Sequence, residues 1–225
     1  MGLIFHKISR DKLRPGDHIY SWRAAYIYAH HGIYIGDGKV IHFTRRHGTG
    51  TFLDKIFLSS NPPKQCLSCG DQSNLSGVLC SCLDCFLDGG DLYLFDYGVK
   101  KVVLMAKIRS GTCTTAPTDA SEQVIARANY LLLHNCFGNY HTFENNCEDF
   151  AIYCKTSLLV GENYLLGRTG QASSVSATSI ATNMISGFDV WGIRSVIRLY
   201  KDIGVRKDAA KVPVEILRRA NAREG

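Results

Sequence analysis

The sequence lacks long apolar segments, and this absence narrows the classes of protein that it can encode. Residues 1–10 carry a short apolar patch without the extended apolar core or the cleavage site of a secretory signal. The uncharged stretch Thr169 to Phe188 covers twenty residues, but half of them are Ser, Thr, Asn or Gln, which is too polar to span a bilayer. Internal repeats are also missing. We therefore expect one main domain in the cytoplasm, with any membrane contact peripheral.

The sequence also lacks a recognisable element for reading nucleic acid, although it is basic at one end. From Trp191 to Gly225, nine Lys and Arg residues stand against four Asp and Glu residues, which accounts for nearly all of the net charge of +6. Such a segment suits contact with an anionic membrane surface, or is a solvated helical surface. Apolar residues from Ala177 to Phe188 recur at helical spacing, as in a lipid-packing sensor, a helix packed on its own domain or a linker. We expect no nucleic-acid partner.

Cysteine, in contrast, is abundant, with nine residues in the chain. In a reducing compartment these are metal ligands, catalytic groups or buried side chains rather than disulfides. Two Cys-x2-Cys pairs, Cys66 with Cys69 and Cys82 with Cys85, are separated by twelve residues, and Cys80 is spare. Four thiolates at this spacing predict a structural Zn²⁺ site with tetrahedral geometry. The alternative is a loop with a few buried cysteines.

The order of the expected elements predicts an α+β fold, with an antiparallel sheet packed against helices. Strand-like segments at residues 18–22, 26–44, 91–97 and 101–108 precede the helix-like segments, without β-α-β alternation. One helix should start near Asp119, which forms a capping box with Glu122. Its buried stripe is Val124, Ile125, Ala128, Leu131 and Leu132. We place a domain at residues 11–157, a Cys-rich insertion at 59–90 within it, and a basic, partly helical tail at 158–225.

Three histidines lie in the strongest hairpin signal of the sequence, around Asp37 and Gly38. A two-residue loop there pairs Ile33 with His42, and alternation then puts His31 on the face of His42. His30 points to the other face unless the strand has a bulge near residues 29–31. The hairpin geometry alone therefore favours His31 as the companion of His42.

A nucleophile is predicted at Cys147, in the stretch Glu144 to Phe150. Asn146 is a good N-cap, which places Cys147 in the first turn of a helix. The partial positive charge of the helix end favours the thiolate there, and a base from His30, His31 or His42 would complete the site. The alternative is a small buried cysteine in front of a capped helix.

These motifs together resemble the lecithin–retinol acyltransferase domain family. The shared residues are His30-x-Gly32-Ile33-Tyr34-Ile35-Gly36-Asp37, Val40-Ile41-His42 and Asn146-Cys147-Glu148. The sequence is most similar to the plant NC-domain branch of this family in two segments, His-His-Gly-Ile-Tyr and Asn-Asn-Cys-Glu-Asp-Phe-Ala. The family is distantly similar to the NlpC-type, papain-like thiol enzymes with the order of elements permuted, so the resemblance implies a permuted papain-like fold.

The resemblance also implies roles for the site residues. Cys147 would be the nucleophile that forms an acyl-thioester, His30 the general base and His42 the group that orients it; His31 is the alternative base. Asn146 caps the helix, and the backbone N–H of Cys147 beside it would stabilise the oxyanion. Animal members usually have His where this chain has Asp149, whose negative charge should raise the pKa of the thiol.

The resemblance thus implies acyl transfer or phospholipase A-type hydrolysis on a phospholipid or other acyl ester, with no cofactor needed for catalysis. A second hypothesis is a catalytically silent module that binds a lipid or a protein. A third is a cysteine peptidase or amidase.

Overall fold

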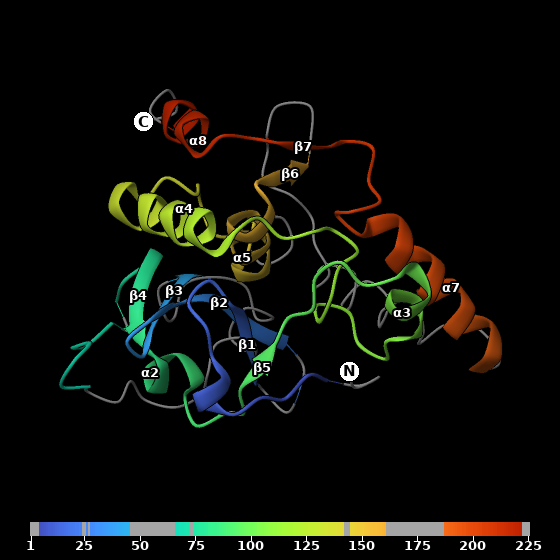
Figure 1. Cartoon of the computed structure of the whole chain (residues 1–225), viewed down its shortest axis with the longest axis horizontal. Coiled ribbons are helices and arrows are strands. Elements are labelled where there is room, and N and C mark those ends of the chain that lie inside the picture. The colour runs from blue at the N-terminus through green and yellow to red at the C-terminus, as the bar shows by residue number, and fades with distance from the viewer. Residues whose placement is uncertain are drawn as a thin grey trace.

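The computed structural model describes residues 5–23, 26, 28–45, 66–72, 74–141, 145–160 and 187–221 (Figure 1). Its strands are β1 His18–Arg23, β2 Tyr28–Gly36, β3 Lys39–Thr44, β4 Gly77–Cys82, β5 Tyr93–Leu94, β6 Leu158–Val160 and β7 Ala209–Lys211. Its α-helices are α2 Leu83–Leu87, α3 Lys101–Ala106, α4 Ser121–His134, α5 Cys147–Thr156, α7 Gly187–Lys201 and α8 Val214–Asn221. A short 3-10 helix, η1, covers Arg10–Lys12.

The centre of the fold is an antiparallel sheet of five strands in the order β4-β3-β2-β1-β5. Helices α4 and α5 lie over one face of this sheet and the short α2 over the other (Figure 1). The main core forms on the α5 face, where Ile33 and Phe43 of the sheet pack with Phe150. On the α2 face, Val40 packs with Phe86. The predicted α+β class with an antiparallel sheet and helices is therefore confirmed.

The register of the β2–β3 hairpin differs from the predicted one by one residue. Ile33 pairs with Ile41, and His42 pairs with Gly32, because the register shifts between Tyr34 and Gly36. The predicted bulge at residues 29–31 is wrong, since β1 pairs with β2 without interruption through that segment. The irregularity lies next to the turn instead, and it puts His42 on the face of His30 rather than of His31.

Two further local predictions were wrong. Residues 101–106 form helix α3 instead of a strand, and its one fully buried residue is Leu104. A single buried side chain in six residues does not fit the alternating burial that a strand of the central sheet requires. At the start of α4 the N-cap is Ala120, without a side-chain cap. The Asp119 carboxylate instead accepts hydrogen bonds from Arg127 and Lys211, and it does not cap the backbone N–H groups at the start of α4.

Helix α4 otherwise follows the sequence pattern. Its buried residues are Val124, Ala128 and Leu131, whereas Ile125 and Leu132 are half-buried. This stripe faces the core that α5 and the sheet share.

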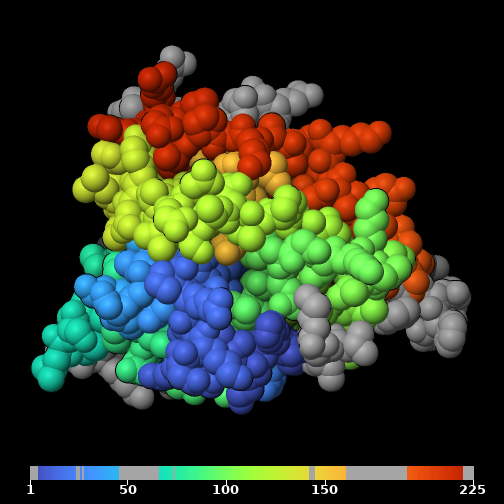
Figure 2. All heavy atoms as spheres, in the orientation of Figure 1, coloured from blue at the N-terminus to red at the C-terminus, as the bar shows by residue number. Residues whose placement is uncertain are grey.

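The C-terminal segment packs against the rest of the chain. Strand β7 pairs with β6, which follows α5 directly. Asp202 accepts hydrogen bonds from Thr114 and Thr115, and Arg198 donates to backbone carbonyls of residues 104 and 107. The red residues of this segment lie next to α4 at the top of Figure 2, and the orange-red α7 lies beside the green α3 at the right. The uncharged stretch predicted at 169–188 lies almost wholly outside the described residues.

No helix among the described residues is long and apolar enough to cross a membrane. Part of the predicted insertion also belongs to the central sheet, because residues 77–82 form β4 and pair with β3.

Candidate functional site

Cys147 is the first residue of α5, behind a complete capping box. The Asn146 side chain accepts hydrogen bonds from the backbone N–H groups of Glu148 and Asp149, at 2.8 and 3.3 Å. The Asp149 carboxylate accepts in return from the Asn146 N–H, at 2.9 Å. The predicted N-cap is confirmed, and these reciprocal bonds fix the position of Cys147 at the start of the helix.

The sulfur of Cys147 lies against the backbone of β2 on either side of His30. Its thiol donates to the carbonyl of Ala29 over 3.7 Å, and it receives the N–H of His31. The backbone groups of residues 29 and 31 point to one edge of β2. Strand β3 pairs with β2 along this same edge, but only from Gly32 onward. The sulfur therefore occupies the place that a neighbouring strand would take.

The imidazoles of His30 and His42 form a pair on the α2 face of the sheet, where both rings lie close to Phe86. His30 Nε2 lies 3.0 Å from His42 Nδ1. His42 Nε2 lies 2.7 Å from the Ser81 hydroxyl, which donates to Gln72 over 2.5 Å. A chain of hydrogen bonds thus leads from β2 through β3 and β4 to the turn that follows Gly70. This chain fixes the ring of His42 and, through it, the ring of His30.

His31 has different surroundings from its neighbour. Its Nδ1 lies 2.9 Å from Nε2 of His18, and its ring stacks on Tyr20. The other nitrogen, Nε2, is buried and has no hydrogen-bond partner recorded in the described part of the chain. The side chain of His31 therefore belongs to an aromatic cluster of the core, while its backbone N–H serves the sulfur.

Burial sets the protonation of these groups. The Cys147 side chain is 1% exposed, and its burial raises the pKa of the thiol to about 11. The N–H of His31 and the hydroxyl of Tyr140 oppose this rise of the pKa, whereas the charges of Glu148 and Asp149 add to it. Burial lowers the pKa of His30 well below its usual range and that of His42 to about 4. These shifts of pKa favour the neutral thiol of Cys147 and the neutral imidazoles of His30 and His42 at neutral pH.

Comparison with known proteins identifies the family. The profile of the family described as "Lecithin retinol acyltransferase" matches residues 11–160. The chain is 50% identical over 237 residues to the protein named "Protein LEAD-SENSITIVE 1" of Arabidopsis thaliana, and the match covers 97% of this chain and 91% of that protein. The chain belongs to the lecithin retinol acyltransferase family. The likeness to the Arabidopsis protein places it in the plant branch of that family.

In this member of the lecithin retinol acyltransferase family, sequence reasoning missed three residues of the candidate site. Ser81 and Gln72 support His42, and Tyr140 contributes its hydroxyl to Cys147. Nothing in the local sequence points to them, because their positions depend on how segments far apart in the chain pack together; Ser81, for example, meets His42 only because β4 pairs with β3. The role of Asp149 could have been predicted from the sequence. Asn146-x-x-Asp149 is a capping-box pattern, which identifies Asp149 as the partner of the N-cap.

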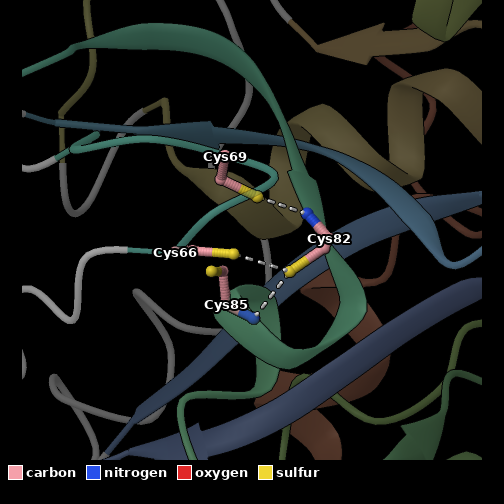
Figure 3. Close-up of side chains that lie close together, drawn as sticks. All are labelled: Cys66, Cys69, Cys82 and Cys85. Atoms are coloured by element: carbon pink, nitrogen blue, oxygen red, sulfur yellow. Dashed lines mark hydrogen bonds between the residues drawn. The ribbon is translucent and has the colours of Figure 1, made fainter.

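A second group of side chains lies at the junction of β4 and α2, next to Ser81. The sulfurs of Cys66, Cys69, Cys82 and Cys85 all lie within 4.8 Å of one another (Figure 3). The Cys66 and Cys82 sulfurs are 3.7 Å apart. The sulfur of Cys69 accepts the N–H of Cys82 over 3.0 Å, and the sulfur of Cys82 accepts the N–H of Cys85 over 3.4 Å. The structure thus brings together the four cysteines of the two predicted pairs.

Proposed function

We propose that the protein catalyses thiol-dependent acyl transfer, or hydrolysis of phospholipase A type, on a lipid ester. The observation that carries this proposal is the position of Cys147 in the first turn of a capped helix, against the segment of β2 that bears His30. Membership of the lecithin retinol acyltransferase family supports the same chemistry. The order of these elements, with the histidine strands before the cysteine helix, supports our further proposal that the fold is a permuted relative of the papain-like enzymes.

In the proposed reaction the thiol proton passes from Cys147 to His30 as the sulfur attacks the carbonyl carbon of the ester. The C–O bond then breaks, and His30 returns the proton to the leaving alcohol, which leaves an acyl-thioester on Cys147. Water, an amine or an alcohol next attacks the thioester and releases the thiol. His42 holds the ring of His30 throughout, because the two imidazoles are hydrogen-bonded at 3.0 Å. The oxyanion would form at the positive end of α5.

The substrate would be reached at a membrane surface, and α7 supports this part of the proposal. Its exposed apolar side chains Ile193, Val196 and Tyr200 recur at helical spacing. Arg194 beside them is exposed as well. An apolar stripe flanked by positive charge suits peripheral contact with an anionic lipid surface. None of the nine cysteines is in a disulfide, which supports our proposal of a reducing compartment, the cytoplasm.

The acyl-enzyme is the first test. The full chain is incubated with vesicles that contain phosphatidylcholine, and the intact mass is measured before and after hydroxylamine, which cleaves thioesters. We expect one added acyl group that hydroxylamine removes, absent from Cys147→Ala. Cys154→Ala is the matched control, because Cys154 is a buried cysteine on the same helix. His30→Ala should also lose the adduct; if only His31→Ala loses it, the general base is wrongly assigned.

One observation favours the second hypothesis, a silent module. The Cys147 thiol is almost fully buried, and its pKa lies far from neutrality. The same experiment separates the alternatives. Vesicle binding without an acyl adduct supports the silent module, and cleavage of a peptide with the ester left intact supports a peptidase or amidase.

A further inference from the structure

We propose that Cys66, Cys69, Cys82 and Cys85 bind one structural Zn²⁺ ion, and that this ion fixes the polar network behind His42. The geometry is the first reason. Four thiolates around a tetrahedral Zn²⁺, each at about 2.3 Å, have their sulfurs about 3.8 Å apart. The sulfurs of Cys66 and Cys82 are 3.7 Å apart, and all four lie within 4.8 Å of one another.

The hydrogen bonds to the sulfurs are the second reason. Backbone N–H groups of Cys82 and Cys85 point to the sulfurs of Cys69 and Cys82. Four thiolates around one Zn²⁺ carry two net negative charges, and N–H donors aimed at sulfur stabilise that excess charge. The turn from Cys66 to Gly70 is closed by a backbone hydrogen bond from the N–H of Gly70 to the carbonyl of Cys66, and it presents both of its thiols to the same point (Figure 3).

Other occupants fit this arrangement less well. A disulfide needs the two sulfurs at about 2.05 Å, well below the 3.7 Å between Cys66 and Cys82. A cluster of several irons would spread the four sulfurs farther apart than one ion does. Zinc in a site of four protein thiolates has no open position for water, so its role here is to hold the chain together.

The ion would hold together two segments that the catalytic histidines depend on. One is the turn at residues 66–70, which leads to Gln72; the other is the end of β4 with α2. Between them Gln72 receives the hydroxyl of Ser81 and donates to the carbonyl of Cys80. Ser81 lies directly before the ligand Cys82 and touches His42. Only this link to His42 rests on the proposed function; the metal site itself does not.

Metal content tests the site. The full chain is purified without chelators, and zinc and iron are measured per chain by inductively coupled plasma mass spectrometry. We expect close to one zinc per chain, lost in Cys66→Ser/Cys69→Ser and kept in the control Cys80→Ala, since Cys80 lies outside the group of four. A wild-type protein without zinc whose four thiols react freely with Ellman's reagent would overturn the proposal, as would iron in place of zinc.

Two further measurements keep the proposal testable if the double variant does not fold. Replacement of the metal by Co²⁺ in the wild-type chain should give thiolate-to-cobalt charge-transfer bands and the d–d bands of a tetrahedral ion; an octahedral spectrum contradicts the site. The imidazole ¹⁵N signals of His42 should shift when a chelator removes the metal, while those of His134 on α4 stay in place. Unchanged His42 signals would show that the link to the histidine pair is wrong, whatever the outcome for zinc and for acyl transfer.

Discussion

His30 and His31 are adjacent in the sequence and have separate roles in the structure. The ring of His30 meets His42, which in turn meets Ser81, so it belongs to a polar chain that can take up and release a proton. The ring of His31 lies between aromatic side chains and His18. The ring of His31 therefore has a packing role, and the polar surroundings of His30 agree with the acid–base role proposed for it.

The buried histidines predict a loss of stability in mild acid. The pKa of His31 is lowered to about 3 and that of His42 to about 4, both by burial. Between about pH 6.5 and pH 4 the unfolded chain binds protons that the folded chain does not, so the free energy of unfolding falls as the pH falls. Each such histidine contributes up to about 1.4 kcal/mol per pH unit in this window. Urea unfolding measured across the window tests the expectation.

Substitution separates the buried histidines from the others. His31→Asn should flatten the dependence of unfolding free energy on pH between about 6.5 and 4. Leu133→Asn, at an exposed position of α4 without a titratable group, is the control and should leave the slope as it is. An unchanged slope in His31→Asn would show that the ring of His31 is protonated in the folded protein.

At the scale of the element, the N-terminus of α5 is the part of the candidate site whose position is fixed by a complete capping box. Its two capping side chains satisfy backbone groups on both sides of Cys147. The same helix packs Phe150 and Ala151 into the main core. The core therefore anchors the helix, and the cap determines where the sulfur lies.

Removal of the cap should affect both stability and the thiol. We expect Asn146→Ala to lower the free energy of unfolding by about 1 kcal/mol, because two N–H groups lose their acceptor. We also expect faster alkylation of Cys147 by iodoacetamide, since the first turn of α5 loosens. Asn146→Asp is the matched control, as its carboxylate can still cap the helix. Equal alkylation rates in Asn146→Ala and the wild type would contradict the positioning role.

These elements show what the sequence could predict. Asn146 as N-cap and the buried stripe of α4 depend on spacing within one element, and both were predicted from the sequence. The pairing of His42 depends on a register shift of one residue between Tyr34 and Gly36, and the residue types in this segment do not predict that shift. Burial of Cys147 depends on how α5 meets β2, so the rise of its pKa outweighed the expected effect of the helix end.

At the scale of the whole molecule, the C-terminal segment is tied to the domain by buried polar contacts. Asp202 reaches Thr114 and Thr115, and Tyr153 of α5 donates to the carbonyl of Val212 over 2.8 Å. Part of the positive charge of this segment is paired within the chain, because Lys211 forms an ion pair with Asp119. On α7 the apolar side chains Ile193, Val196 and Tyr200 are exposed.

The proposed contact of α7 with lipid can be tested on this side of the helix. The double variant Ile193→Ser/Tyr200→Ser should lower binding to anionic vesicles roughly ten-fold or more, since two exposed apolar side chains no longer insert. Flotation with phosphatidylserine-containing vesicles measures the binding. Leu133→Ser is the control, because Leu133 is 78% exposed on α4, away from this stripe. Equal loss in the control would show that binding is not directed by α7.

The one-residue irregularity between Tyr34 and Gly36 has a consequence for how this hairpin can evolve. Side chains alternate between faces, so regular pairing through this position, with no residue removed, would set His42 opposite Ile33 and turn it towards α5. Homologues that lack one residue at this irregularity can instead pair regularly and still keep the two imidazoles on one face. The spacing between the two histidines therefore has to be judged together with the register of the strands that carry them.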